Sequence, residues 1–171
     1  MKTYLLLAFI TVYSVIGFSQ NQNSIIKAQA MDMAKALLKK DFPTFTKYMH
    51  PKVVEMAGGK TKALERMDTM NAVAAQFGAE IKSILIGNPG AVVNYKKELQ
   101  VTLPQTTEMK TNFGNLALET TLIGVSRDGG KNWYFIDTSV YNVNDLKKAM
   151  PDLSPDLVIP PSKPPKFTPV Q

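Results

Sequence analysis

The chain has 171 residues, of which 44% are hydrophobic and 20% charged, and its formal net charge is +6. This length and apolar content predict one folded domain with its own core and exclude an intrinsically disordered chain. The sequence contains no cysteine and only one histidine, which excludes disulfide scaffolds, thiolate metal sites, cysteine nucleophiles and multi-histidine metal centres. We therefore expect neither a metal nor a cofactor.

The first residues have the layout of a secretory signal peptide. Lys2 supplies a positive charge, an apolar stretch follows, and Gly17 and Ser19 place small residues before a cleavage site at Gln20. The stretch is shorter than the roughly 18–20 residues that span a bilayer comfortably. We expect residues 1–19 to be removed on export to the periplasm or the exterior, leaving no transmembrane span. An uncleaved anchor is the alternative.

The first part of the mature chain has a helical pattern. Asn23 or Ser24 is predicted to cap a first helix, and its apolar face recurs at three- and four-residue spacing. This face comprises Ile26, Ala30, Met33 and Leu37. A short helix over residues 43–49 and a strand over Val53–Ala57 are expected to follow.

A third helix is predicted after Thr61, which would cap it, and before Gly78, which would end it. Its predicted buried face comprises Leu64, Met67, Met70, Ala74 and Phe77. If this face is core, Leu64→Ala should destabilise the protein by about 2–5 kcal/mol.

After Gly78 the apolar period changes to two, which is typical of strands. The predicted strands cover residues 80–86, 93–103, 116–126 and 133–140, with Pro104 ending the second. The third strand is apolar on both faces, so we expect both faces to be covered. A last helix over about 143–150 ends at Pro151.

Helices first and strands afterwards predict an α+β fold, in which the N-terminal helices pack on a curved antiparallel sheet. We expect the folded domain to span residues 20–151. Residues 152–171 are rich in proline and are predicted to form an extended tail, either lying against the domain or free.

The segment from Ser126 to Trp133 fits S-x-D-x-G-x-x-W and resembles the Asp-box found in hairpin turns of sialidases. Its serine and aspartate oxygens can accept backbone N–H bonds, and its glycines can adopt positive φ. A propeller would need several copies, and one is present. We therefore interpret Ser126, Asp128, Gly130 and Trp133 as a structural hairpin; a calcium or ligand loop is the alternative.

A longer resemblance covers residues 24–140. Its most suggestive residues are Asp41, Phe45, Tyr48, His50-Pro51, Val53 and Gly58-Gly59-Lys60. With the order of elements, they are similar to the NTF2-like (cystatin-like cone) superfamily. The resemblance implies helices over a concave sheet and a ligand site between the two. The superfamily includes enzymes, transport factors and non-catalytic ligand-binding proteins, so the fold alone does not select a function.

Two residues are candidates for proton transfer in such a pocket. Asp137 shares the strand parity of two aromatic residues, so it is an interior carboxylate if their rings face inward; a water-facing strand end is the alternative. His50 is the other candidate, with a turn or helix C-cap as its alternative role. The candidate pocket residues are Tyr48, Met67, Met70, Tyr95, Trp133 and Phe135, any of which could instead be ordinary core.

The leading hypothesis is an exported, non-enzymatic domain that binds a small apolar ligand or a protein partner, with a homodimer formed through the outer sheet face. The second hypothesis is an isomerase- or hydratase-like enzyme that uses Asp137. The third is a basic protein that binds envelope polyanions. Nucleic acid is not expected, because no aromatic residues alternate with basic residues along a strand.

Overall fold

The computed structural model describes residues 3–141, 143–161 and 163–169, with side chains from Asn21 onward. The predicted signal peptide and its cleavage site lie outside the residues whose side chains are described. Within the described part, the chain forms five α-helices and a six-stranded sheet whose paired strands are all antiparallel. The predicted α+β class is therefore confirmed.

The first helix, α1 (Thr3–Leu38), buries three of the four predicted stripe residues, and Leu37 is half-buried. Ile26, Ala30 and Met33 are at most 5% exposed, because their spacing places them on one side of the helix. The predicted N-cap at residues 23–24 is wrong, because Ser24 lies inside α1 and its hydroxyl donates a hydrogen bond to the Asn21 carbonyl.

Two short helices follow, α2 (Phe42–Tyr48) and α3 (Pro51–Met56). Asp41 caps α2 by accepting a hydrogen bond from the Thr44 backbone N–H at 3.0 Å. The strand expected over residues 53–57 is wrong. Pro51 occupies the first helical position of α3, where its missing N–H has no cost, and this directs the apolar run that follows into a helix.

Helix α4 (Lys60–Gln76) begins after Gly59 without a side-chain cap, so Thr61 does not have its predicted role. The expected buried face is also wrong at two of its five positions, because Met70 is 66% and Phe77 57% exposed. The half-buried stripe comprises Leu64, Met67, Asn71 and Ala74. Helix α4 packs against α2 and α3, and its C-terminal end reaches the sheet through the Asn112 N–H, which donates to the Phe77 carbonyl.

The centre of the sheet is a long hairpin of two strands. Shorter strands pair along both of its edges in the order β1-β3-β4-β5, with β2 also on β3 and β6 also on β4. The strands are β1 (Glu80–Ile86), β2 (Val93–Tyr95), β3 (Glu98–Thr111), β4 (Gly114–Ser126), β5 (Tyr134–Asp137) and β6 (Lys166–Pro169).

The strand expected over residues 93–103 is two strands, β2 and β3, joined by a tight turn. Lys96 and Lys97 both have positive φ, at 49° and 67°, as a two-residue hairpin turn requires. Pro104 does not end β3. Its carbonyl accepts a hydrogen bond from the Gly87 N–H just beyond the end of β1, where a missing proline N–H leaves no strand partner unsatisfied.

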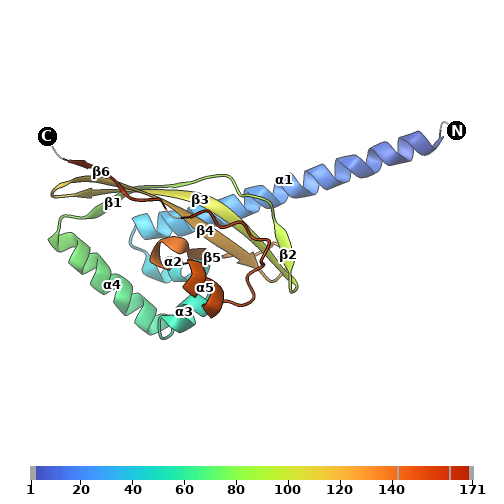
Figure 1. Cartoon of the computed structure of the whole chain (residues 1–171). Helices are drawn as coiled ribbons and strands as arrows, with labels where there is room; N and C mark the ends of the chain where they lie inside the picture. The colour runs from blue at the N-terminus through green and yellow to red at the C-terminus, as the bar shows by residue number, and fades with distance from the viewer. Residues whose placement is uncertain (1–2, 142, 162, 170–171) are drawn as a thin grey trace.

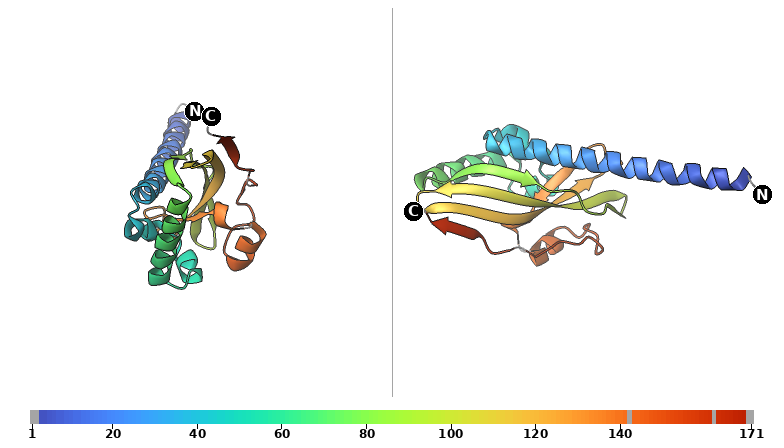
Figure 2. Two further views of the ribbon diagram at one scale, coloured as in Figure 1. Left: turned by 90° about the vertical axis from the view of Figure 1, so that its left-hand side faces the viewer. Right: turned by 90° about the horizontal axis from the view of Figure 1, so that it is seen from above.

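The sheet carries a hydrophobic core on each face. Helices lie on both faces (Figures 1 and 2). Helices α1, α2 and α4 lie on the inner face, and α5 (Val143–Ala149) lies with the C-terminal segment on the outer face (Figure 2, right). Leu153 and Leu157 are buried in the outer core, and β6 joins the sheet, so the segment expected as an appended tail completes the domain.

Candidate functional site

Asp137 lies at the end of β5 with the strand parity of Trp133 and Phe135, as predicted, but its carboxylate is already engaged. One oxygen accepts the Ser139 backbone N–H at 2.8 Å and caps the 3-10 helix η1 (Thr138–Val140). The other accepts the side-chain amide of buried Gln105, also at 2.8 Å. This geometry is that of a cap.

His50 is 3% exposed and caps the start of α3, not the end of α2 as the sequence suggested. Its Nδ1 accepts the Lys52 backbone N–H at 3.2 Å. Burial lowers the pKa of the imidazole to about 4, with a further decrease from the Arg127 charge, which the Glu98 carboxylate opposes. The ring is therefore neutral near pH 7.

Three of the six candidate pocket residues meet in the inner core, and the other three lie apart from them. Trp133 and Phe135 are 1% and 2% exposed in the inner core, and Tyr48 packs partly buried against the same core. Tyr95 lies on the edge strand β2, with the Lys96 ammonium 5.5 Å from its ring. Of the two methionines on α4, Met67 is half-buried and Met70 is exposed, as described above.

The Asp-box segment forms the turn between β4 and β5. Asp128 Oδ1 accepts the Ser126 hydroxyl at 2.9 Å and the backbone N–H groups of Lys131 and Asn132 at 3.1 and 2.9 Å. Hydrogen bonds to the carboxylate lower the pKa of Asp128 to about 2, and those from the backbone and side chain of Asn132 have the largest effect. The Trp133 indole N–H donates to the Gly130 carbonyl at 3.0 Å, which seats the ring under the turn.

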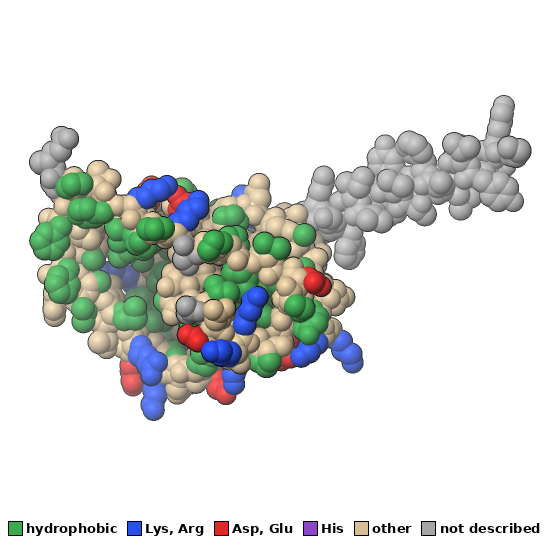
Figure 3. Space-filling view, viewed as in Figure 1, with side chains coloured by type: hydrophobic (Ala, Val, Ile, Leu, Met, Phe, Trp, Pro, Cys, Tyr) green, Lys and Arg blue, Asp and Glu red, His purple; other side chains and the backbone are tan. Residues whose placement is uncertain are grey.

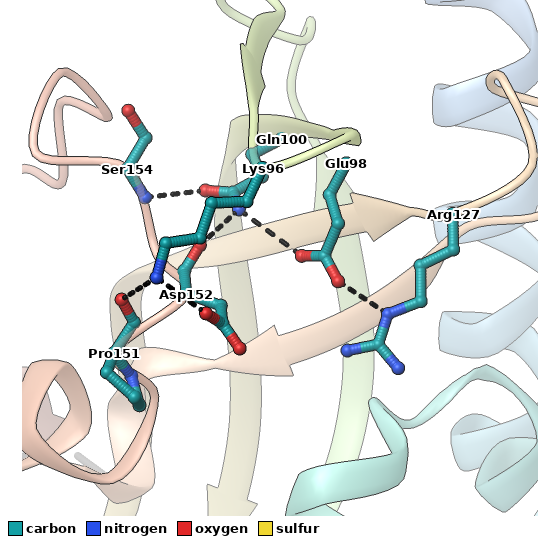
Figure 4. Close-up of polar contacts among 7 residues, drawn as sticks. All are labelled: Lys96, Glu98, Gln100, Arg127, Pro151, Asp152 and Ser154. Atoms are coloured by element: carbon teal, nitrogen blue, oxygen red, sulfur yellow. Dashed lines mark hydrogen bonds and ion pairs between the residues drawn. The ribbon is translucent and has the colours of Figure 1, made fainter.

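The C-terminal segment is attached to the sheet by a polar cluster (Figure 4). Gln100 is fully buried, and its side chain bonds the backbone N–H of Ser154 and the carbonyl of Asp152 at 2.8 and 2.7 Å. Beside it, Glu98 pairs with Arg127 at 2.5 Å. Sequence reasoning missed this cluster, because its members are dispersed in the chain and individually ordinary.

The inner face of the sheet is apolar but not sealed near the β3–β4 turn. We call this end of the sheet the distal sheet. In strand register, Leu116 and Leu118 of β4 lie opposite Met109 and Thr107 of β3, and Ile84 of β1 lies opposite Thr107. All five are half-buried and lie outside both cores. Helix α4 lies on the same side of the sheet (Figure 2). Strand alternation in residues 105–118 is the sequence signal that could have identified this face.

Exposed apolar side chains extend from this face to the end of the molecule where α4, β1 and β6 meet (Figure 3, left). Phe77, Phe113 and Phe167 are 57%, 70% and 54% exposed. They lie around the β3–β4 turn, since the Phe77 carbonyl accepts the Asn112 N–H and the Phe167 ring covers Gly114. Exposed apolar groups that gather in this way are typical of interaction surfaces.

The outer face has a cleft of about 370 Å³ between the sheet and the C-terminal segment. Its floor includes Thr102, Pro104 and Thr106 of β3, and Pro160 and Pro161 form part of its cover. Farther along the same face, Ile123 and Val125 of β4 belong to the outer core. The apolar outer face that suggested a dimer is therefore covered by the chain itself.

Eight of the nineteen basic side chains that the structure describes are dispersed into local ion pairs. Carboxylates lie within ion-pair distance of Lys35, Lys52, Lys82, Lys96, Arg127, Lys148, Lys163 and Lys166. This dispersal does not favour the polyanion hypothesis, which needs a continuous basic face.

Among the described side chains, no three of the acidic or histidine groups cluster closely enough to hold a metal ion. In that same part of the chain, no helix has the length and apolar character that crossing a membrane requires. Comparisons with protein-family models, curated proteins and solved structures give no significant match.

Proposed function

We propose that this chain is an exported, non-enzymatic NTF2-like domain that binds a small apolar ligand between α4 and the inner face of the distal sheet. The observation that carries the proposal is the unsealed apolar face around Met109, Leu116 and Leu118. Burying such side chains against a ligand is favourable by about 25 cal/mol per Å² of apolar surface.

The position of α4 supports the same proposal. The helix is supported by α2 and α3 at one end and by the β3–β4 turn at the other. Its least exposed stripe over residues 64–74 is mostly half-buried and not sealed. Two apolar surfaces on the same side of the sheet, neither of them sealed, suit a ligand with a flexible hydrocarbon chain.

The enzyme alternative receives less support from Asp137. A general acid or base needs an oxygen aimed at the substrate, and both oxygens of this carboxylate accept hydrogen bonds from the protein. We therefore place binding ahead of catalysis.

The test is fluorescence titration with a dansyl-labelled undecanoic acid. The wild-type protein should give saturable, blue-shifted fluorescence, and Leu118→Asp should weaken binding by at least about tenfold, because a carboxylate on this face has no partner. Leu85→Asp is the matched control, since Leu85 is 60% exposed on the opposite face of the sheet, paired with Thr106. Absence of saturable binding, or equal loss in both variants, contradicts the proposal.

A further inference from the structure

The C-terminal strand β6 is weakly attached to the sheet. Its four residues pair with Gly114–Ala117 of β4, and all four side chains are exposed. Even Phe167 keeps 54% of its surface in water. Little apolar surface is lost when β6 leaves, so its opening free energy belongs to the low end of the range within one protein.

Two ion pairs provide the remaining attachment. Lys163 and Lys166 lie 2.6 and 2.5 Å from the two carboxylate oxygens of Glu119, and these hydrogen bonds lower the pKa of Glu119 to about 2. The lysine side chains are 67% and 70% exposed. Exposed pairs of this kind contribute about 0–1 kcal/mol each, so they guide the tail into register more than they hold it.

The segment that leads from the outer core to β6, residues 160–165, has the composition of an extended linker. We call it the arm. Leu157 is the last buried residue that the structure describes in the chain. Residues 160–165 carry four prolines, and the segment crosses the outer cleft instead of filling it. Proline-rich segments are stiff and extended, at about 3.1 Å per residue. The arm can leave the surface without disturbing the outer core around Leu153 and Leu157.

We propose that residues 163–169 exchange between two copies of this chain, so that β6 of one copy pairs with β4 of the other. The vacated edge at Gly114–Ala117 exposes unpaired backbone groups that favour a new strand. The same segment from a second copy supplies the identical backbone register and both lysines for Glu119. The strand pairing and ion pairs of residues 163–169 are therefore preserved in the exchanged form.

Concentration decides between the two forms. A tethered segment has an effective concentration on the order of millimolar for its own slot. The closed monomer is therefore favoured in dilute solution, and exchange increases as the protein concentration approaches that value.

The absence of cysteine permits a direct trap. Leu116 and Phe167 are register partners, so the single variants Leu116→Cys and Phe167→Cys are mixed at high concentration and oxidised. The expected product is a disulfide-linked dimer whose tryptic peptides join position 116 to position 167. In this mixture, that link can form only between two copies.

The positive control is a single chain that carries both cysteines, which should form an intramolecular disulfide. The matched control mixes Thr107→Cys with Leu118→Cys, partners in the fixed β3–β4 hairpin, and should give little product. If the double variant closes but the 116–167 mixture gives no more product than this control, the proposal is wrong. The adjacent pair Ala117 and Lys166 gives the same decision if the first double variant does not close.

Discussion

The side-chain carbonyl of Gln100 accepts a hydrogen bond from the backbone N–H of Ser154 at 2.8 Å, although 54 residues separate the two. Gln100 has no exposed surface, and its amide also donates to the Asp152 carbonyl at 2.7 Å. One buried side chain thus satisfies two backbone groups of the segment that covers the outer core.

Replacing Gln100 with leucine, which has a similar volume, should destabilise the protein by about 2–4 kcal/mol, because each orphaned buried group costs about 1–3 kcal/mol. Urea denaturation measures the effect. Gln76→Leu, at an exposed position on α4, is the control and should change stability by less than about 0.5 kcal/mol. Equal stability of the two variants would show that the C-terminal segment does not depend on this contact.

Fully buried and half-buried positions should respond differently to truncation. Leu122 is fully buried in the inner core, so Leu122→Ala should cost about 2–5 kcal/mol. Leu64 of α4 is only half-buried, and Leu64→Ala should cost about 1 kcal/mol, less than its sequence pattern predicted. Thermal unfolding of both variants tests the order; a larger loss at Leu64 would mean that this side chain belongs to a closed core.

The Asp-box turn should make stability depend on pH at the acid end. Asp128 has a folded pKa of about 2, below its ordinary 3.8, so its contribution is present above pH 4 and is lost as the pH falls toward 2. The isosteric variant Asp128→Asn should be less stable than wild type at pH 6, and the difference should shrink at pH 2. A difference that stays constant with pH would exclude a role for the carboxylate charge.

His50 should make the stability of the protein depend on pH in a second range. Its folded pKa of about 4 lies below the ordinary 6.5, so the neutral ring stabilises the fold above pH 6.5, and this contribution is lost as the pH falls from 6.5 to 4. Between pH 7 and pH 5 the wild-type protein should lose about 1–2 kcal/mol relative to His50→Asn, which keeps a capping side chain. An imidazole that titrates near 6.5 by NMR would contradict this.

Local sequence signals succeeded where one segment contains the whole cause. The stripe in α1, the serine, aspartate and glycine positions of the Asp-box turn, and strand β1 follow from spacing and residue type. They failed at Pro104, where the conformation depends on the end of β1 beside β3. At Val53 the cause was local but was misread, because Pro51 starts a helix two residues earlier.

The pocket candidates show the same limit. Parity placed Asp137, Trp133 and Phe135 on one face. In the register Phe135 and Asp137 lie opposite Gly124 and Leu122 of β4, and Trp133 joins Phe135 in the inner core. Parity could not show that the side-chain amide of Gln105, 32 residues away, donates a hydrogen bond to this carboxylate. Nor could it show that both rings lie in a closed core. Whether a side chain is already hydrogen-bonded or packed depends on residues that are close in space, not on those close in sequence.

The sequence by itself determined the α+β class, the alternation of the strands and the chemistry of the β4–β5 turn, because each depends on periodicity or on bonds within a few residues. Only the tertiary structure decided which apolar faces are sealed. Helix α4 leaves the inner face around Leu118 open, whereas Leu153 and Leu157 close part of the outer face. Both faces are apolar in the sequence, and burial depends on whether a distant segment is long enough, and held closely enough, to cover them.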